Sequence, residues 1–176
     1  MEKATFAGGC FWCTEAIFKR VKGVVSVMSG YSGGSMEKPD YETVSEGVTG
    51  HAEAIQVEFD PKIISYEKLV EIFFHLHDPT TVNRQGNDVG TQYRSVIFYH
   101  SPGQKEAAEK VRKQIEDEHV YQAPIVTEIV PFENFYKAEE YHQNFYENNP
   151  EYGYCKVIID PKIKKLLREF KEEVKE

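Results

Sequence analysis

Two cysteines stand three residues apart near the start of the chain, in GGCFWCTEAIF, which covers residues 8–18. Cys10 follows two glycines and stands where a helical pattern begins, so its sulfur is expected beside free backbone N–H groups and the positive end of a helix dipole. That setting favours the thiolate, the reactive form of cysteine. The plain alternative is a buried small side chain at a strand-to-helix turn.

Cys13 lies one helical turn after Cys10 on the same face, which suits disulfide exchange, although the spacing alone is weak evidence. A closed zinc site needs a second pair of ligands, and Cys155 belongs to no other CxxC and has no close histidine. His75 and His77 stand two residues apart near the end of a predicted helix, where we expect them to cap or pack. The zinc interpretation is therefore incomplete, and we expect no metal site.

Glu53 belongs to an alternating stretch, AEAIQVEFD, at residues 52–60. Counting by twos from Glu53 gives three large apolar residues, whereas Gln56 and Glu58 fall on the other face of the strand. A carboxyl buried on the apolar side without a cationic partner would have a raised pKa and would stay protonated near neutral pH, as a general acid must. If Glu53 instead lies at the exposed end of the strand, it is solvated, and the pattern leaves both interpretations open.

Two tyrosines stand beside glycine-rich turns. Tyr41 follows the loop SGGSMEKPD, and Tyr93 follows NDVG at the start of a predicted strand. Taken alone, tyrosines in such places pack more often than they catalyse.

The composition excludes several classes of protein. A net charge of −8 argues against a nucleic-acid groove or a surface attracted to anionic lipid. The first residues lack the apolar core of a signal peptide, and no apolar run approaches the roughly 18 residues of a membrane span. We expect a soluble cytoplasmic protein of one domain over residues 1–176, in which cysteines are more often catalytic or redox-active than structural.

Short β-rich stretches alternate with longer helical ones, and no internal repeat or low-complexity linker interrupts them. The order β-α-β-β-α-β-α-β predicts an α+β fold: a two-layer sandwich with a mixed, largely antiparallel sheet and a ferredoxin-like core. A C-terminal extension of about residues 148–176 carries Cys155. The expected strands are residues 2–7, 24–31, 52–60, 91–100 and 123–132, and the expected helices are residues 11–22, 65–77, 102–120, 138–147 and one after Pro161.

With these residues in view, the chain resembles the peptide methionine sulfoxide reductase A family. GGCFWCTEAIF is similar to that family's GCFW motif, and GYSGG to its next glycine turn. PDYETVSEGVTGHAEAIQVEFDP and FFHLHDPTTVNRQGNDVGTQYRSVIFY are similar to its central and third blocks. The resemblance runs from about residue 4 to 155 in the family's own order.

The resemblance implies a role for each matching residue. Cys10 stands at the family's nucleophile and Glu53 at its proton donor, while Tyr41 and Tyr93 match two tyrosines that hydrogen-bond the sulfoxide oxygen. These roles fit the chemistry, because a thiolate attacks the sulfur of a sulfoxide and the oxygen leaves well only when it is protonated. The expected enzyme is a peptide-methionine (S)-S-oxide reductase that acts on oxidised methionine in proteins or on free methionine sulfoxide.

The resemblance also implies binding roles. Phe11 and Trp12 match the aromatic residues that hold the substrate's methyl group, and Asp88 lies at a position implicated in the polar network. No cofactor is implied, since thioredoxin or a small dithiol supplies the electrons. We expect the protein to act as a monomer.

Reduction of a sulfoxide would leave Cys10 as a sulfenic acid, which a second thiol converts to a disulfide. Cys155 aligns with a C-terminal resolving cysteine of some members, but the flexible tail that often follows it is replaced here by KVIIDPKIKKLLREF, which reads as ordered. Cys13, where many members carry a small residue, is the other candidate, and a relay through both is a third. We favour Cys155 for the first step. The competing functions are a general dithiol-disulfide exchanger that uses CFWC and a non-enzymatic metal-binding module.

Overall fold

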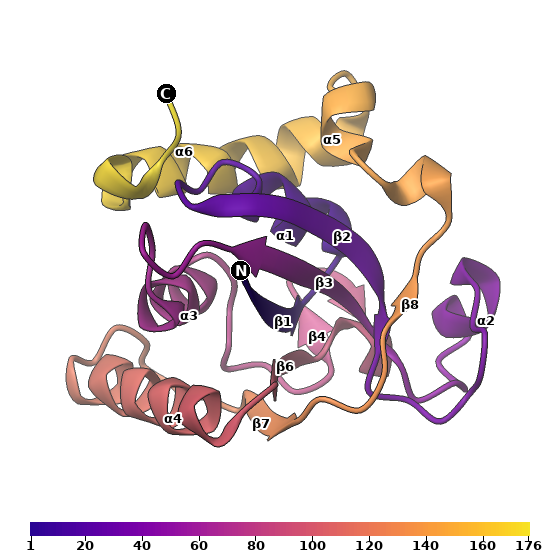
Figure 1. Cartoon of the computed structure of the whole chain (residues 1–176). Helices are drawn as coiled ribbons and strands as arrows, with labels where there is room; N and C mark the ends of the chain where they lie inside the picture. The colour runs from indigo at the N-terminus through magenta and orange to yellow at the C-terminus, as the bar shows by residue number, and fades with distance from the viewer.

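A six-stranded sheet forms the centre of the protein in a computed structural model that describes residues 1–176 (Figure 1). The strands lie in the order β7-β6-β1-β3-β2-β8, and every neighbouring pair is antiparallel except β6 with β7. The predicted mixed, largely antiparallel sheet is therefore confirmed. The strands are β1 (Glu2–Gly8), β2 (Val24–Ser32), β3 (Ala52–Phe59), β6 (Ser95–Tyr99), β7 (Glu128–Pro131) and β8 (Tyr136–Lys137).

Helices fill the connections between these strands. Two of them start at serine caps, where Ser65 Oγ accepts the Lys68 N–H and Ser101 Oγ accepts the Gln104 N–H. A short hairpin, β4 (Arg84–Gln85) with β5 (Asp88–Val89), precedes a 3₁₀ turn at Thr91–Tyr93. The helices are α1 (Phe11–Phe18), α2 (Tyr41–Ser45), α3 (Tyr66–His75), α4 (Pro102–Asp117), α5 (Phe145–Asn148) and α6 (Asp160–Glu169).

The main core lies between the sheet and the helical layer formed by α1, α3 and α4. Alternation along β3 sends Ile55, Val57 and Phe59 into this core, whereas Ala52 and Ala54 join a smaller cluster on the opposite face. The main core holds 27 buried residues and the smaller cluster five, so most of the apolar burial is between sheet and helices. This is the two-layer arrangement that the sequence predicts.

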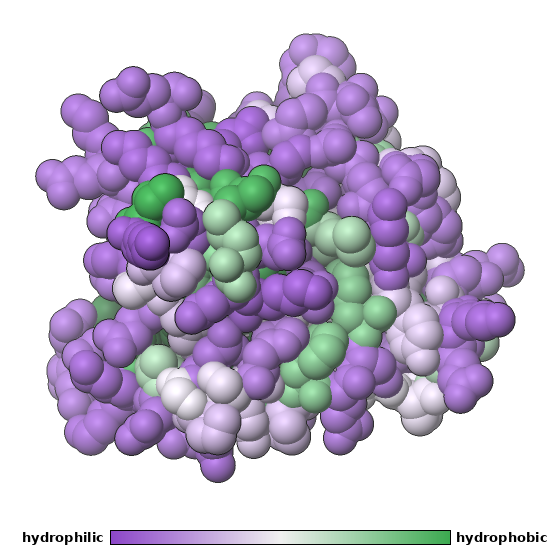
Figure 2. Space-filling view, in the orientation of Figure 1, coloured by the Kyte–Doolittle hydropathy of each residue, from purple (hydrophilic) through white to green (hydrophobic).

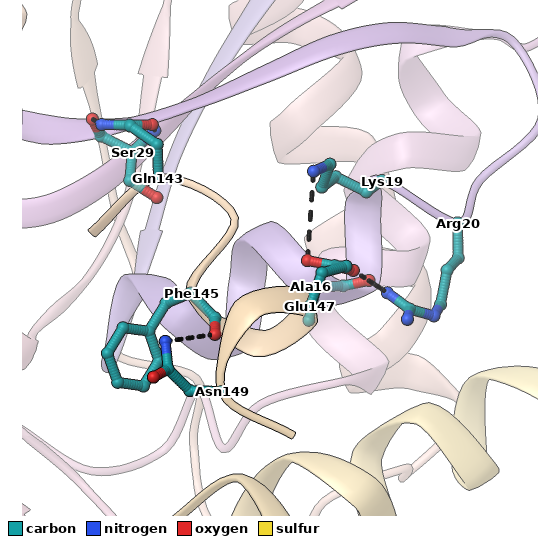
Figure 3. Close-up of polar contacts among 8 residues, drawn as sticks. All are labelled: Ala16, Lys19, Arg20, Ser29, Gln143, Phe145, Glu147 and Asn149. Carbon is teal, nitrogen blue, oxygen red and sulfur yellow. Dashed lines mark hydrogen bonds and ion pairs between the residues drawn. The ribbon is translucent and has the colours of Figure 1, made fainter. Parts of the chain in front are cut away.

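The predicted helix over residues 138–147 is wrong. The chain makes a 3₁₀ turn at Glu140–His142, becomes extended at Gln143, and turns through a positive φ of 54° at Asn144 before α5 begins. The Gln143 side chain explains the break, because it accepts the Ser29 N–H at 3.0 Å and donates to the Ser29 carbonyl at 2.9 Å (Figure 3). A side chain that completes the hydrogen bonding of β2 holds its own backbone out of a helix.

The C-terminal segment is ordered and helical. A single π-helical turn, Cys155–Ile159, leads directly into α6, so the last helix begins one residue before the predicted Pro161. Glu147 on α5 forms ion pairs with Lys19 at 4.0 Å and Arg20 at 3.0 Å, at the end of α1 (Figure 3). This segment therefore packs against α1.

The end of the chain is fastened to the loop that follows α1. Val174 forms an antiparallel bridge with Val21, the Lys22 N–H donates to the Glu173 carbonyl at 2.7 Å, and the Lys175 N–H donates to the Arg20 carbonyl at 2.8 Å. Residues 173–175 are thus held against the residues that follow α1.

The face shown in Figure 2 is largely hydrophilic, with smaller hydrophobic areas over the strands. This distribution agrees with a net charge of −8. None of the helices combines the length and apolar character that crossing a membrane requires.

Candidate active site

Cys10 occupies the turn between β1 and α1. Gly9, just before it, has a φ of +88°, and a Cβ placed there would lie 2.5 Å from Cγ of Gln85, so both the conformation and the close approach require glycine. Cys10 itself is the residue that precedes the first turn of α1, and it remains partly exposed. The glycine turn thus leaves Cys10 partly exposed at the start of α1.

The side chains of the two cysteines of the motif are hydrogen-bonded to each other. Burial and a hydrogen bond from the Cys10 thiol to Cys13 raise the pKa of Cys10 well above its usual value. The same hydrogen bond lowers the pKa of Cys13 to about 7, with help from Lys162 and Tyr154. The expectation that the helix start makes Cys10 a thiolate is therefore wrong for the resting state, because burial outweighs the backbone N–H of Trp12.

Glu53 is buried directly behind Cys10. Its side chain is 1% exposed, and its Oε1 accepts the Phe11 N–H at 3.2 Å. Burial raises the pKa of Glu53 to about 8, against the opposing effect of that hydrogen bond, and Asp88 and Cys13 raise it further. The buried alternative for Glu53 holds, and its carboxyl group is neutral at pH 7.

The two candidate tyrosines flank Cys10 and Glu53. Tyr41 opens α2, where its N–H donates to Oε2 of Glu139 at 3.0 Å. Tyr93 ends the 3₁₀ turn that follows the β4–β5 hairpin. The pKa of each hydroxyl is raised by burial first and then by the proximity of Glu53. The fold therefore brings the four groups together from four separate stretches of chain.

The two aromatics of the motif occupy different environments. Phe11 is fully buried, with its ring 5.0 Å from the ring of His142, whereas Trp12 is only partly buried. Trp12 stacks on Phe145 with ring centroids 3.7 Å apart, and its indole N–H donates to Nδ1 of His142 at 3.0 Å. One face of Trp12 is thus already covered by α5.

Cys155 is shielded from solvent, as Cys13 is. It is fully buried in a cluster with Cys13, Ala16 and Ile159, and burial raises its pKa. No disulfide is present among the three cysteines. Cys155 therefore borders Cys13, on the side of α1 that faces the C-terminal segment.

A cavity of about 300 Å³ opens on Cys10. Asp88 of β5 lines it, and the Tyr154 hydroxyl donates to Oδ2 of Asp88 at 2.9 Å. Half of the lining comes from the C-terminal segment, namely Tyr154, Val157, Ile158, Pro161 and Lys162. This segment therefore forms one wall beside the reactive sulfur.

Four residues of the site were missed from the sequence. His142 accepts from Trp12, Glu139 holds Tyr41, Tyr154 reaches Asp88, and Lys162 lines the cavity. Tyr154 alone carried a signal, because it precedes Cys155 in GYC. The protein has no group of three or more His, Cys, Asp or Glu side chains placed to hold a metal ion.

Comparison with known proteins identifies the family. The family model described as peptide methionine sulfoxide reductase matches residues 2–175. A peptide methionine sulfoxide reductase MsrA of Sulfolobus acidocaldarius is 58% identical over 98% of this chain and 97% of its own length. Reduced Mxr1 of Saccharomyces cerevisiae matches with a TM-score of 0.79 at 38% identity, over 88% of each chain. Mxr1 in complex with Trx2 matches with a TM-score of 0.55 at 30% identity, over 82% of this chain and 84% of that one. Full-length sequence matches and structural likeness agree, and the chain belongs to the peptide methionine sulfoxide reductase family.

Proposed function

We propose that this protein reduces the S epimer of methionine sulfoxide, with Cys10 as the nucleophile and Glu53 as the acid. The observation that carries the proposal is the neutral, buried carboxyl group of Glu53 held beside Cys10 by the Phe11 N–H at 3.2 Å. A general acid for this reaction must hold its proton at neutral pH, and a pKa of about 8 meets that condition.

The chemistry divides between the two groups. Cys10 passes its proton to Cys13 and attacks the sulfur of the sulfoxide, while Glu53 protonates the departing oxygen. The protonated oxygen then moves from the substrate sulfur to the Cys10 sulfur as the transient bond between the two sulfurs breaks. Methionine leaves with its sulfur reduced by two electrons, and Cys10 is left as a sulfenic acid. The hydroxyls of Tyr41 and Tyr93 stabilise the developing charge on oxygen, an effect worth about 3 kcal/mol in comparable sites. Phe11 and Trp12 hold the methyl group, and Asp88 completes the polar surroundings.

A second thiol, Cys13 or Cys155, then forms a disulfide, which thioredoxin or a small dithiol reduces. The recorded complex of Mxr1 with Trx2 supports thioredoxin as the partner. The substrate is methionine sulfoxide in proteins or as the free amino acid. Monomeric state and cytoplasmic location stay predictions.

The test is a thioredoxin-coupled assay that follows NADPH consumption with each epimer of a methionine sulfoxide peptide. We expect turnover with the S epimer only and none in Cys10→Ser, whose folding is checked by circular dichroism. Full activity in Cys10→Ser, or no turnover of the S epimer by the unmodified protein, would refute the proposal.

Glu53→Gln separates this function from general dithiol exchange. A sulfoxide reductase loses its acid in this variant, whereas a protein that only exchanges disulfides through Cys10 and Cys13 keeps its activity on an insulin-type disulfide. We expect methionine formation to fall at least about 10²-fold, the usual contribution of a general acid.

A further inference from the structure

A thiol, a phenol and a carboxylate form a chain beside the nucleophile. Cys13 Sγ lies 3.6 Å from the Tyr154 hydroxyl, and that hydroxyl donates to Oδ2 of Asp88 at 2.9 Å. The three groups come from α1, from the residue before the π-helical turn, and from β5. Because the Tyr154 hydroxyl directs its hydrogen toward Asp88, the phenol oxygen can accept a hydrogen bond from the Cys13 thiol.

We propose that Cys13 resolves the sulfenic acid of Cys10 and that Tyr154 passes the Cys13 proton to Asp88. The inference rests on the proposed function, because that function forms the sulfenic acid. Cys13 sulfur attacks the Cys10 sulfur, an S–S bond forms and the S–O bond breaks. Two electrons pass from the Cys13 sulfur to the sulfenic sulfur. The departing hydroxide takes a proton from the solvent that reaches the partly exposed Cys10 and leaves as water, while the Cys13 proton goes to Asp88 and from there back to solvent, so that the protons balance.

Cys13 must lose a proton before it can attack, because it receives the Cys10 proton in the first half of the reaction. In the resting protein the hydrogen bond from Cys10 is the largest influence that favours the Cys13 thiolate. Once Cys10 carries oxygen, that thiol donor is gone, and Cys13 holds the proton it received. Tyr154 and Lys162 are the groups still in place that lower the pKa of Cys13. The titratable groups around Cys13 are Cys10, Cys155, Glu53, Asp88, Tyr154 and Lys162.

Lys162 strengthens this setting. Its ammonium group forms no ion pair or hydrogen bond within the protein, and it lines the same cavity as Cys10, Asp88 and Tyr154. A cation that no carboxylate neutralises favours a thiolate nearby. The C-terminal segment thus supplies both Tyr154 and Lys162 to the resolving thiol.

Geometry favours Cys13 over Cys155 for this step. The Cys13 N–H donates to the Cys10 carbonyl at 3.1 Å, so the two residues share the first turn of α1. Cys155 is fully buried and belongs to the π-helical turn, on a different element from Cys10. In a Cys10–Cys13 disulfide the partly exposed sulfur is that of Cys10, which an external thiolate can attack while Cys13 leaves as the thiolate of lower pKa.

The decisive variant is Tyr154→Phe, with Tyr152→Phe as its matched control. Both tyrosines pack edge-on against Trp12, at 5.8 and 6.1 Å, but the Tyr152 hydroxyl makes no hydrogen bond within the protein. One equivalent of sulfoxide is mixed with reduced protein. Methionine release, sulfenic acid trapped by a dimedone-type probe, and disulfide formation are then followed separately from pH 6 to 10.

We expect the rate of disulfide formation, taken relative to the variant's own rate of methionine release, to fall about tenfold in Tyr154→Phe at pH 7, with sulfenic acid that the probe traps. A thiol near its ordinary pKa of about 8.5 is only a few per cent ionised there. The deficit should disappear toward pH 9–10, and Tyr152→Phe should behave as the unmodified protein. Equal disulfide rates in Tyr154→Phe and the control, or a deficit that is the same at every pH, would overturn the role of Tyr154.

Disulfide mapping by mass spectrometry tests the choice of thiol. After one turnover, Cys155→Ser should contain a Cys10–Cys13 disulfide formed at the normal rate. Cys13→Ser, which also lacks the group that accepts the Cys10 proton, should release methionine more slowly and should leave the sulfenic acid that it forms unresolved. A Cys10–Cys155 disulfide formed at the normal rate in Cys13→Ser would overturn the inference while leaving the proposed function intact. Absence of methionine in the unmodified protein would instead refute the function.

Discussion

At the scale of single residues, the position of Glu53 on the apolar face of β3 accounts for the raised pKa of its carboxyl group. Its place on β3 sends it to the same face as Ile55, Val57 and Phe59, where it is 1% exposed. Burial without a cation raises its pKa to about 8. The pattern predicts the face, but only the structure shows that the carboxyl group is enclosed.

The activity should follow the protonation of this carboxyl. We expect single-turnover methionine formation to fall as pH rises above about 8, because ionised Glu53 no longer protonates oxygen. Glu53→Gln should lose this alkaline limb along with most of the rate. Glu58→Gln is the matched control, since Glu58 lies on the other face of β3 and accepts from Ser26 Oγ at 3.2 Å. A rate that stays flat from pH 7 to 10 would argue against Glu53 as the acid.

The same pKa should affect stability. A folded-state pKa of about 8, above an unfolded value of 4.5, means that the stabilising effect is complete below pH 4.5 and is lost as pH rises through 8. At about 1.4 kcal/mol per unit, the loss is at most about 5 kcal/mol. Urea unfolding should therefore show Glu53→Gln to be more stable than the unmodified protein at pH 8.5 and close to it at pH 4.5. The opposite order at pH 8.5 would contradict the buried neutral carboxyl.

At the scale of elements, α6 acts both as a packing surface and as part of the cavity wall. Leu166 is fully buried in the main core, whereas Leu167 beside it is 47% exposed. We expect Leu166→Ala to cost about 2–5 kcal/mol of unfolding free energy and Leu167→Ala less than about 1 kcal/mol. Urea midpoints measure both, and equal losses would show that α6 does not pack as described.

Elements with a strong periodicity of apolar residues were predicted from the sequence. Elements whose conformation depends on a hydrogen bond to a distant part of the chain were not. The strands β1, β2 and β3 and the helices α3 and α4 follow from alternation and helical spacing, with ends shifted by a few residues. The helix expected at 138–147 fails because Gln143 bonds to Ser29, a partner 114 residues away. No local pattern contains such a contact.

At the scale of the whole molecule, the active site exists because the sheet order brings distant segments together. Cys10 follows β1, and Glu53 lies in β3, its neighbour in the sheet. The alternation on β3 and the resemblance of motifs predicted these residues. Tyr154, His142 and Lys162 were not predicted, because their positions depend on how the C-terminal segment folds back onto α1.

The fluorescence of Trp12 can test the prediction that the chain is a single domain. Trp12 is the only tryptophan, and it joins α1 to the C-terminal segment through its stacking on Phe145 at 3.7 Å. In one cooperative unit, tryptophan fluorescence and far-UV circular dichroism should report the same urea midpoint. A fluorescence transition at lower urea would show that the C-terminal segment detaches first and that the chain is not a single unit.

The fastening of the last residues to the loop after α1 has a practical consequence for handling the protein. An affinity tag fused after Glu176 would begin three residues beyond Val174 of the Val21–Val174 bridge, and force on the tag would act near the end of the helix that carries Cys13. The Met1 side chain is 74% exposed, and β1 begins at Glu2 on the sheet side. Affinity tags and surface attachments are therefore better placed at the amino terminus, where force on the chain does not act on α1.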